Sequence, residues 1–183
     1  MVELERHSPL LQSQWESTAG DLRLRELAPI AMLRVQSLER DTVCAAGSLR
    51  LPRKPNTVEG NDPFALWMAP GDWLVYSRTH SASDLASELR AEIHAQSLLT
   101  TDVSGGRCVL ELCGARTLDV LMRDCPLDLE GGAIPAEQCA QTLFAHTTVI
   151  IHRPSSALTH WILFVERSVS QHVWEWLIDT AAP

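Results

Sequence analysis

Histidines are the residues in this chain whose side chains could most readily bind a metal ion or move a proton. The chain has seven of them, at positions 7, 80, 94, 146, 152, 160 and 172. A metalloprotease helix needs two histidines four residues apart, with a glutamate beside the first. No pair here has that spacing with a carboxylate between. We therefore interpret the histidines as surface or interface residues.

Cysteine is the second residue type that could hold a metal ion. The five cysteines include no C-x-x-C pair; they are Cys44, Cys108, Cys113, Cys125 and Cys139. A zinc site built on Cys108 and Cys113 would need two more ligands at finger-like spacing, and none is visible. We expect buried or free thiols in a reducing cytoplasm and no metal site in this chain.

Two short motifs could support phosphate binding or acid–base chemistry. The turn Ser104–Arg107 lacks the further glycines and the lysine of a P-loop, so a hairpin turn is the simpler interpretation. Asp124 and Asp128 could pair as acid and base, but a solvated helix end explains them more simply. The patterns G-x-S-x-G and G-x-G-x-x-G are absent. We predict no catalytic and no cofactor-binding residue in this chain.

The overall charge is acidic, with a net charge of −8 and Lys54 as the single lysine. Nucleic-acid binding needs a basic surface that displaces counterions from phosphates, so we exclude it. No apolar run reaches the ~18 residues needed to cross a bilayer. The first residues, Met1–Arg6, are partly acidic and do not resemble a signal peptide, so we expect a cytoplasmic protein.

Two stretches of the chain carry the same order of predicted elements, which indicates an internal repeat. In the first half, Ile30–Val35 predicts a strand, and Ser37 opens a short helix through Ala46 that Gly47 ends. In the second half, Cys108–Leu112 predicts the corresponding strand.

The helix of the second half is predicted to begin at Gly114 and to stop before Pro126. Its apolar face would consist of Leu118, Leu121, Met122 and Cys125.

Each half closes with a strand and an amphipathic helix. The closing strands are Trp73–Tyr76 and Trp161–Phe164. The first helix has Leu85, Leu89 and Ile93 on one face and Ser81 or Ser83 at its start; the second has Val169, Val173, Trp176 and Leu177 on one face. Ser168 and Gln171 predict a capping box for the second helix.

The predicted fold class is α+β, with two pseudo-repeated β-α-β-type units whose mostly antiparallel sheets carry helices on one face. Pro52–Pro63 and Glu130–Pro135 predict surface loops, and Thr147–His152 predicts a further strand. The predicted division is an N-terminal arm at 1–20, a first half at 21–99 and a second half at 100–183, forming one compact unit.

Six tryptophans offer the strongest sign of protein contacts. Trp73, Trp161 and Trp176 fall on predicted core faces. Trp174 lies off the apolar stripe of its helix, and Trp15 lies in a polar stretch. Exposed aromatic residues are enriched where proteins meet proteins, so we predict that Trp15 and Trp174 help form an interface.

Three groups of segments, in order, resemble the gamma subunits of heterotetrameric sarcosine oxidases. The first group is Leu51–Thr57 and Leu66–Leu74. The second group is Thr101–Ser104, Val109–Ala115 and Cys125–Leu129. The third group is Phe164–Ser168 and Val173–Leu177. Together they extend over nearly the whole chain.

This resemblance implies a non-catalytic structural subunit of a complex. The complex would oxidise sarcosine to glycine with oxygen, release hydrogen peroxide and pass the one-carbon unit to tetrahydrofolate. The implied partners are the alpha, beta and delta subunits, with FAD, FMN, NAD and tetrahydrofolate in alpha and beta and zinc in delta. The implied fold is similar to the folate-binding aminomethyltransferase domain of the glycine-cleavage T-protein.

The sequence departs from that enzyme family in one stretch. The family has a strand that bears a glycine and then an aspartate that contacts folate, and the corresponding stretch, Phe144–Arg153, has neither. A folate acceptor would lose the group that orients it. Two alternatives stay open: a stand-alone folate-dependent one-carbon transferase, and a homo-oligomeric small-molecule-binding module with Pro52–Pro63 as a lid.

Overall fold

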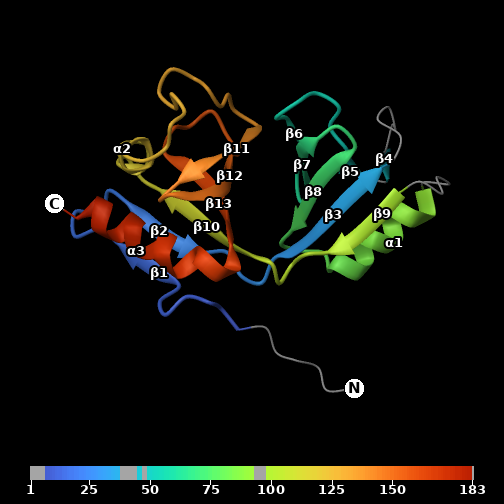
Figure 1. Cartoon of the computed structure of the whole chain (residues 1–183), viewed down its shortest axis with the longest axis horizontal. Coiled ribbons are helices and arrows are strands. Elements are labelled where there is room, and N and C mark those ends of the chain that lie inside the picture. Colours follow the sequence, from blue (N-terminus) through green and yellow to red (C-terminus); the bar gives the residue numbers. More distant parts are fainter. Residues whose placement is uncertain (1–6, 38–44, 47–48, 93–97, 183) are drawn as a thin grey trace.

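Two antiparallel β-sheets dominate the computed structural model, which describes residues 7–37, 45–46, 49–92 and 98–182 (Figure 1). The six-stranded sheet, in spatial order, consists of β1 (Gln14–Glu16), β2 (Arg23–Glu26), β10 (Arg107–Cys113), β13 (His160–Glu166), β12 (Thr147–Arg153) and β11 (Gln138–Phe144). The five-stranded sheet consists of β6 (Val58–Gly60), β7 (Phe64–Ala69), β8 (Asp72–Ser77), β3 (Ala31–Ser37) and β9 (Leu98–Asp102).

The remaining elements are short. A two-stranded ribbon is formed by β4 (Ala45–Ala46) and β5 (Leu49–Arg50). The helices are α1 (Ala82–Glu92), α2 (Thr117–Met122), the 3-10 turn η1 (Arg167–Val169) and α3 (Ser170–Ala181). Figure 1 shows α1 against the five-stranded sheet and α3 against the six-stranded sheet.

Alternation along the strands sorts the side chains into three cores, because successive residues of a strand point to opposite faces. On β8, Trp73 and Val75 pack toward α1, whereas Leu74 and Tyr76 join a core that both sheets share. On β13, Leu163 packs in the core that contains the buried residues of α3. Each sheet therefore carries its helices on one face and meets the other sheet with its second face, which confirms the predicted fold class.

The strands predicted from apolar runs are all present. They correspond to β3, β8, β10, β12 and β13. The strands β1, β2, β4, β5, β6, β7, β9 and β11 were not predicted. The five predicted strands are all inner strands of the two large sheets, whereas the missed strands include the four edges β1, β11, β6 and β9 and the inner strands β2 and β7.

The helix predicted from Ser37 to Ala46 is wrong in the part that the structure describes. Ser37 ends β3, and Ala45 and Ala46 form β4, which pairs with β5. Residues 38–44 and Gly47 lie outside the described residues. Pairing with a neighbouring strand has here overridden the helical preference of alanine.

The helix predicted from Gly114 is shorter than expected. Gly114 has a φ of +132°, which is not helical, and its N–H bonds to Thr159 O at 2.9 Å. The helix α2 therefore begins at Thr117 and ends at Met122, four residues before Pro126. Met122, predicted to be buried, is exposed.

One of the two predicted helix caps is present. Ser81 Oγ accepts a hydrogen bond from the N–H of Asp84 at 3.1 Å and so caps the start of α1. Ile93, which was predicted to lie on the apolar face of this helix, is outside the described residues. The capping box at Ser168 is wrong, because α3 begins at Ser170 without a side-chain cap. Gln171 Oε1 instead accepts the N–H of Leu11 at 3.0 Å, which ties the N-terminal segment to α3.

The predicted loop Pro52–Pro63 contains the edge strand β6 and joins the two sheets. Val58 N–H donates to Glu137 O at 3.1 Å, and Cys139 N–H donates to Asn56 O at 2.9 Å. This segment is therefore a bridge between sheets rather than a loose surface loop. The loop predicted at Glu130–Pro135 is confirmed.

The two sheets do not follow the predicted halves strand by strand. The strand β2, from the predicted first half, lies in the six-stranded sheet beside β10. The strand β9 spans the predicted boundary at residue 100. The division into an N-terminal arm and two halves stays a prediction about folding units.

Gly114→Ala is expected to destabilise the chain by about 2 kcal/mol, because a side chain there is both strained and obstructed. A Cβ at Gly114 would lie 2.2 Å from Asp21 O. Urea unfolding measures the effect. Gly105→Ala is the matched control, since a Cβ there meets nothing within 4 Å. Equal stability of the two variants would contradict this prediction.

Candidate functional site

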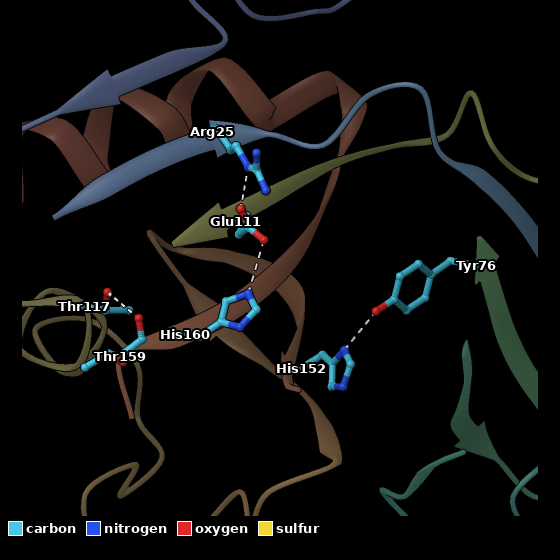
Figure 2. A network of polar contacts seen from close by, with 7 residues as sticks. All are labelled: Arg25, Tyr76, Glu111, Thr117, His152, Thr159 and His160. Atoms are coloured by element: carbon cyan, nitrogen blue, oxygen red, sulfur yellow. Dashed lines mark hydrogen bonds and ion pairs between the residues drawn. The ribbon is translucent and has the colours of Figure 1, made fainter. Parts of the chain in front are cut away.

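A group of polar side chains lies on the face of the six-stranded sheet that turns toward the other sheet. Arg25 on β2 is directly opposite Glu111 on β10, and Cys113 on β10 is directly opposite His160 on β13. Glu111 and Cys113 share this face because they are two residues apart on one strand. Figure 2 shows Glu111 between Arg25 and His160. The chain thus gathers these groups from three strands that are distant in sequence.

Glu111 is the one buried carboxylate among the described residues, with 7% of its surface exposed. Arg25 Nε donates to Glu111 Oε2, and His160 Nε2 lies 3.2 Å from Glu111 Oε1. Burial opposes the charged form, but the hydrogen bond and charge of Arg25, together with His160, hold the pKa of Glu111 below its usual value. Burial, followed by the charge of Glu111, raises the pKa of the Cys113 thiol.

A second polar contact crosses from one sheet to the other. Tyr76 Oη on β8 lies 3.2 Å from His152 Nδ1 on β12 (Figure 2), and Phe64 stacks on Tyr76 with ring centroids 4.9 Å apart. Burial lowers the pKa of His152 to about 4, so the ring is neutral near pH 7. Burial raises the pKa of Tyr76. The pair therefore joins the two sheets as a hydrogen bond between neutral groups.

A cleft of about 400 Å³ lies between the two sheets beside their shared core. Its charged lining residues form two ion pairs, Arg34–Asp72 at 2.5 Å and Arg107–Glu166 at 2.7 Å. The lining also includes apolar Met68, Leu74, Val103 and Ile150. Each charge in this cleft is thus already paired with an opposite one.

The two predicted interface tryptophans occupy different positions from those expected. Trp174, predicted to be exposed, is only 1% exposed and packs in the core with Leu177. Trp176, predicted to be in the core, is half-buried beside the rings of His146 and His172. Trp15 on β1 is half-buried and packs against the same core as Trp174. The prediction that Trp174 is exposed was wrong, and the interface role of Trp15 stays a prediction.

The histidines divide into two kinds. His7, His80, His146 and His172 are exposed, as predicted. His152 is 1% exposed, so its interpretation as a surface residue was wrong. His160 is half-buried, and His94 lies outside the described residues.

The two motifs considered for chemistry serve local structure. The turn Ser104–Arg107 connects β9 to β10, which belong to different sheets, so it is not the hairpin predicted. Ser104 Oγ accepts the N–H of Met32 at 2.8 Å. Asp128 Oδ1 accepts the N–H of Gly131 at 2.8 Å. Asp124 Oδ2 is buried without a hydrogen-bond partner in the described part of the chain.

Sequence reasoning missed Glu111, His160 and the pair His152–Tyr76 as parts of one polar face. The available signal was a glutamate inside the apolar run Cys108–Leu112, since a charged residue in a buried strand requires a partner. Pattern alone could not identify Arg25 and His160 as those partners, because they come from other strands. Cys113 was considered as a metal ligand, and the groups that lie close to it are Glu111 on β10 and His160 on β13.

The fold of two antiparallel sheets is shared with an aminomethyltransferase. Glycine cleavage system aminomethyltransferase T from Bartonella henselae matches with a TM-score of 0.60 at 13% identity, over 87% of this chain and 46% of that one. This likeness concerns the fold alone, and it confirms the predicted fold. Within the described residues, no helix is long and apolar enough to span a lipid bilayer.

The chain belongs to the sarcosine oxidase gamma subunit family, which matches residues 39–183. The sarcosine oxidase subunit gamma of an Arthrobacter species is 30% identical over 169 residues, covering 89% of this chain and 81% of the relative. That of Corynebacterium sp. (strain P-1) is 29% identical with the same coverage. A chain of the heterotetrameric sarcosine oxidase from Corynebacterium sp. U-96, in complex with pyrrole 2-carboxylate, matches with a TM-score of 0.77 at 25% identity, over 87% of this chain and 83% of that one. The resemblance found in the three groups of segments is confirmed.

Proposed function

We propose that this chain is a non-catalytic structural subunit of a cytoplasmic, heterotetrameric sarcosine oxidase. The complex oxidises sarcosine to glycine, releases hydrogen peroxide and passes the one-carbon unit to tetrahydrofolate. The observation that carries the proposal is the likeness to one chain of a heterotetrameric sarcosine oxidase, which extends over 87% of this chain. The free thiols of Cys108, Cys113, Cys125 and Cys139 support a cytoplasmic location.

The partners in this proposal are the alpha, beta and delta subunits, which hold FAD, FMN, NAD, tetrahydrofolate and zinc. The described residues of this chain do not fit folate. In the stretch Phe144–Arg153, the inward side chains of β12 are Ile150 and His152, and the stretch contains no carboxylate. The carboxylates of the cleft between the sheets, Asp72 and Glu166, are each paired with an arginine. No step of the reaction is therefore assigned to this chain.

Purification of the affinity-tagged chain from its native host tests the proposal. We expect the other three subunits to be recovered with it in equal amounts, in one species with flavin absorbance. A tagged chain recovered alone as a closed homo-oligomer would contradict the subunit role, because such an oligomer leaves no unmatched surface for partners. Micromolar binding of tetrahydrofolate by the isolated chain would revive the one-carbon transferase alternative.

Trp15→Leu is expected to weaken the affinity of this chain for its partners by about tenfold without unfolding it, because a large aromatic ring at an interface centre carries much of the binding energy. Nearby Leu11 is 90% exposed and is held beside α3, so the same surface offers a second apolar contact. Titration of the assembled complex by dilution measures the effect.

The matched control is Leu99→Ala, which removes an exposed leucine from β9 of the five-stranded sheet, whereas Trp15 is on β1 at the edge of the six-stranded sheet (Figure 1). It should leave the affinity unchanged. An equal loss of affinity in both variants, or no loss of affinity with Trp15→Leu, would contradict the prediction that the N-terminal segment is part of the interface.

A further inference from the structure

The cluster of Glu111, Cys113 and His160 contains the three donor types that bind zinc in proteins. These are a carboxylate oxygen, a thiolate sulfur and an imidazole nitrogen. One ligand atom from each residue lies within 4.8 Å of the other two. The cluster is separate from the cleft between the sheets, whose lining does not include these three residues.

The distance between the two best-placed donors fits a shared metal ion. A tetrahedral zinc ion bound to nitrogen and oxygen at about 2.0–2.1 Å holds those two atoms about 3.3 Å apart. His160 Nε2 and Glu111 Oε1 lie 3.2 Å apart. The sulfur of Cys113 lies within 4.8 Å of both atoms, because Cys113 and His160 are directly opposed on paired strands.

Arg25 already holds the carboxylate in the required orientation. Its Nε donates to Glu111 Oε2, which leaves Oε1 directed toward His160 (Figure 2). Carboxylate ligands of metal ions are commonly fixed by such a hydrogen bond on the other oxygen. Arg25 and the three candidate ligands are all on strands, which position ligands more rigidly than loops do.

Exposure of the cluster permits an ion to enter. The side chain of His160 is 34% exposed, and Cys113 is half-buried, whereas the side chain of Glu111 is 9% exposed. An ion bound here would have three protein ligands and one position facing solvent.

We propose that Glu111 Oε1, Cys113 Sγ and His160 Nε2 bind one divalent transition-metal ion of the zinc class, with water as the fourth ligand. Binding replaces the proton of the Cys113 thiol, so that one proton is released to solvent for each ion bound. The ion, the thiolate and the carboxylate together are neutral, and Arg25 remains the partner of Glu111 Oε2. This site belongs to the gamma chain itself and does not depend on its role as a subunit.

Cobalt(II) titration of the full-length, metal-stripped chain tests the site, because cobalt bound to a thiolate gives a charge-transfer band in the near ultraviolet. We expect one cobalt ion to bind per chain, and the band to disappear when zinc displaces the cobalt. Cys113→Ser should abolish the band, and His160→Gln and Glu111→Gln should each weaken binding by at least about tenfold. The controls are Cys108→Ala, on the same strand but on its other face, and His146→Gln; both should bind as the unmodified chain does.

Alkylation of the unmodified chain gives a readout that requires no variant to fold. Zinc is expected to protect Cys113 from iodoacetamide, as read by mass spectrometry of its peptide. The proposal is overturned if the chain binds no cobalt at a stoichiometric level, if Cys113→Ser retains the band, or if zinc leaves the alkylation of Cys113 unchanged.

Discussion

Trp174→Ala is expected to lower the free energy of unfolding by about 4 kcal/mol, the range found when a buried tryptophan side chain is truncated. The ring of Trp174 is 1% exposed, and it packs in the core that α3 forms with the six-stranded sheet. Removing it leaves a cavity among residues of several strands that cannot close without moving the sheet. Urea denaturation of the isolated chain, followed by circular dichroism, measures this loss.

Trp176→Ala is the matched control, since it removes the same side chain from the same helix at a half-buried position. It should cost about half as much or less, because less apolar surface is lost from the core. A larger loss of stability for Trp176→Ala than for Trp174→Ala would contradict the orientation of α3. It would also restore the prediction that Trp174 is an exposed interface residue.

Acidification from pH 7 to pH 4 is expected to cost the chain about 3 kcal/mol of stability through His152 alone. The ring has a pKa of about 4 in the folded chain and 6.5 as its ordinary value. Between these values the unfolded chain binds a proton that the folded chain does not, so the free energy of unfolding falls as the pH falls through this window. Protonation also makes both ring nitrogens donors, so that Nδ1 can then only donate to Tyr76 Oη.

Unfolding curves of the unmodified chain and of His152→Gln, recorded at several pH values between 4 and 7, test this expectation. Glutamine does not titrate and can still accept a hydrogen bond from Tyr76, so the pH dependence of the variant should be shallower by about 3 kcal/mol. His146→Gln, which removes an exposed histidine, is the control variant. Identical curves for the unmodified chain and His152→Gln would show that His152 is not buried in neutral form.

The strands β3, β8, β10, β12 and β13 could be predicted from the sequence because each contains a run of apolar residues buried on both faces. Leu74, Val75 and Tyr76 form one continuous apolar run, as do Ile162, Leu163 and Phe164. Burial on both faces follows from the shared core between the sheets and the helices outside. Short edge strands such as β1 and β6 lack this property, so their residues resemble those of loops.

The orientation of α3 could not be decided from the periodicity of its residues. Val173, Leu177 and either tryptophan fit the helical spacing equally well, because residues three and four apart lie on one face. The buried stripe consists of Ser170, Trp174, Leu177 and Ala181, with Val173 beside it. The small residues Ser170 and Ala181 mark this stripe, and their importance appears only when the helix lies against the sheet.

The cluster around Glu111 could not be predicted because it depends on strand register. Arg25 and Glu111 are 86 residues apart in sequence, and Glu111 and His160 are 49 apart. A shift of one residue in the pairing of β10 would turn Glu111 to the opposite face. Motif spacing along the chain therefore detects a finger-like metal site but not a cluster whose members come from separate paired strands.

Turnover of sarcosine, followed as hydrogen peroxide released, is the most direct test of the claim that this chain retains an aminomethyltransferase-like fold without its chemistry. The measurement compares the isolated chain, the four-subunit complex and the complex prepared without this chain. We expect peroxide from the four-subunit complex, none from the isolated chain, and failure of the remaining subunits to assemble when the chain is omitted. Conversion of sarcosine or another one-carbon donor by the isolated chain, in the presence of oxygen and tetrahydrofolate, would contradict the account.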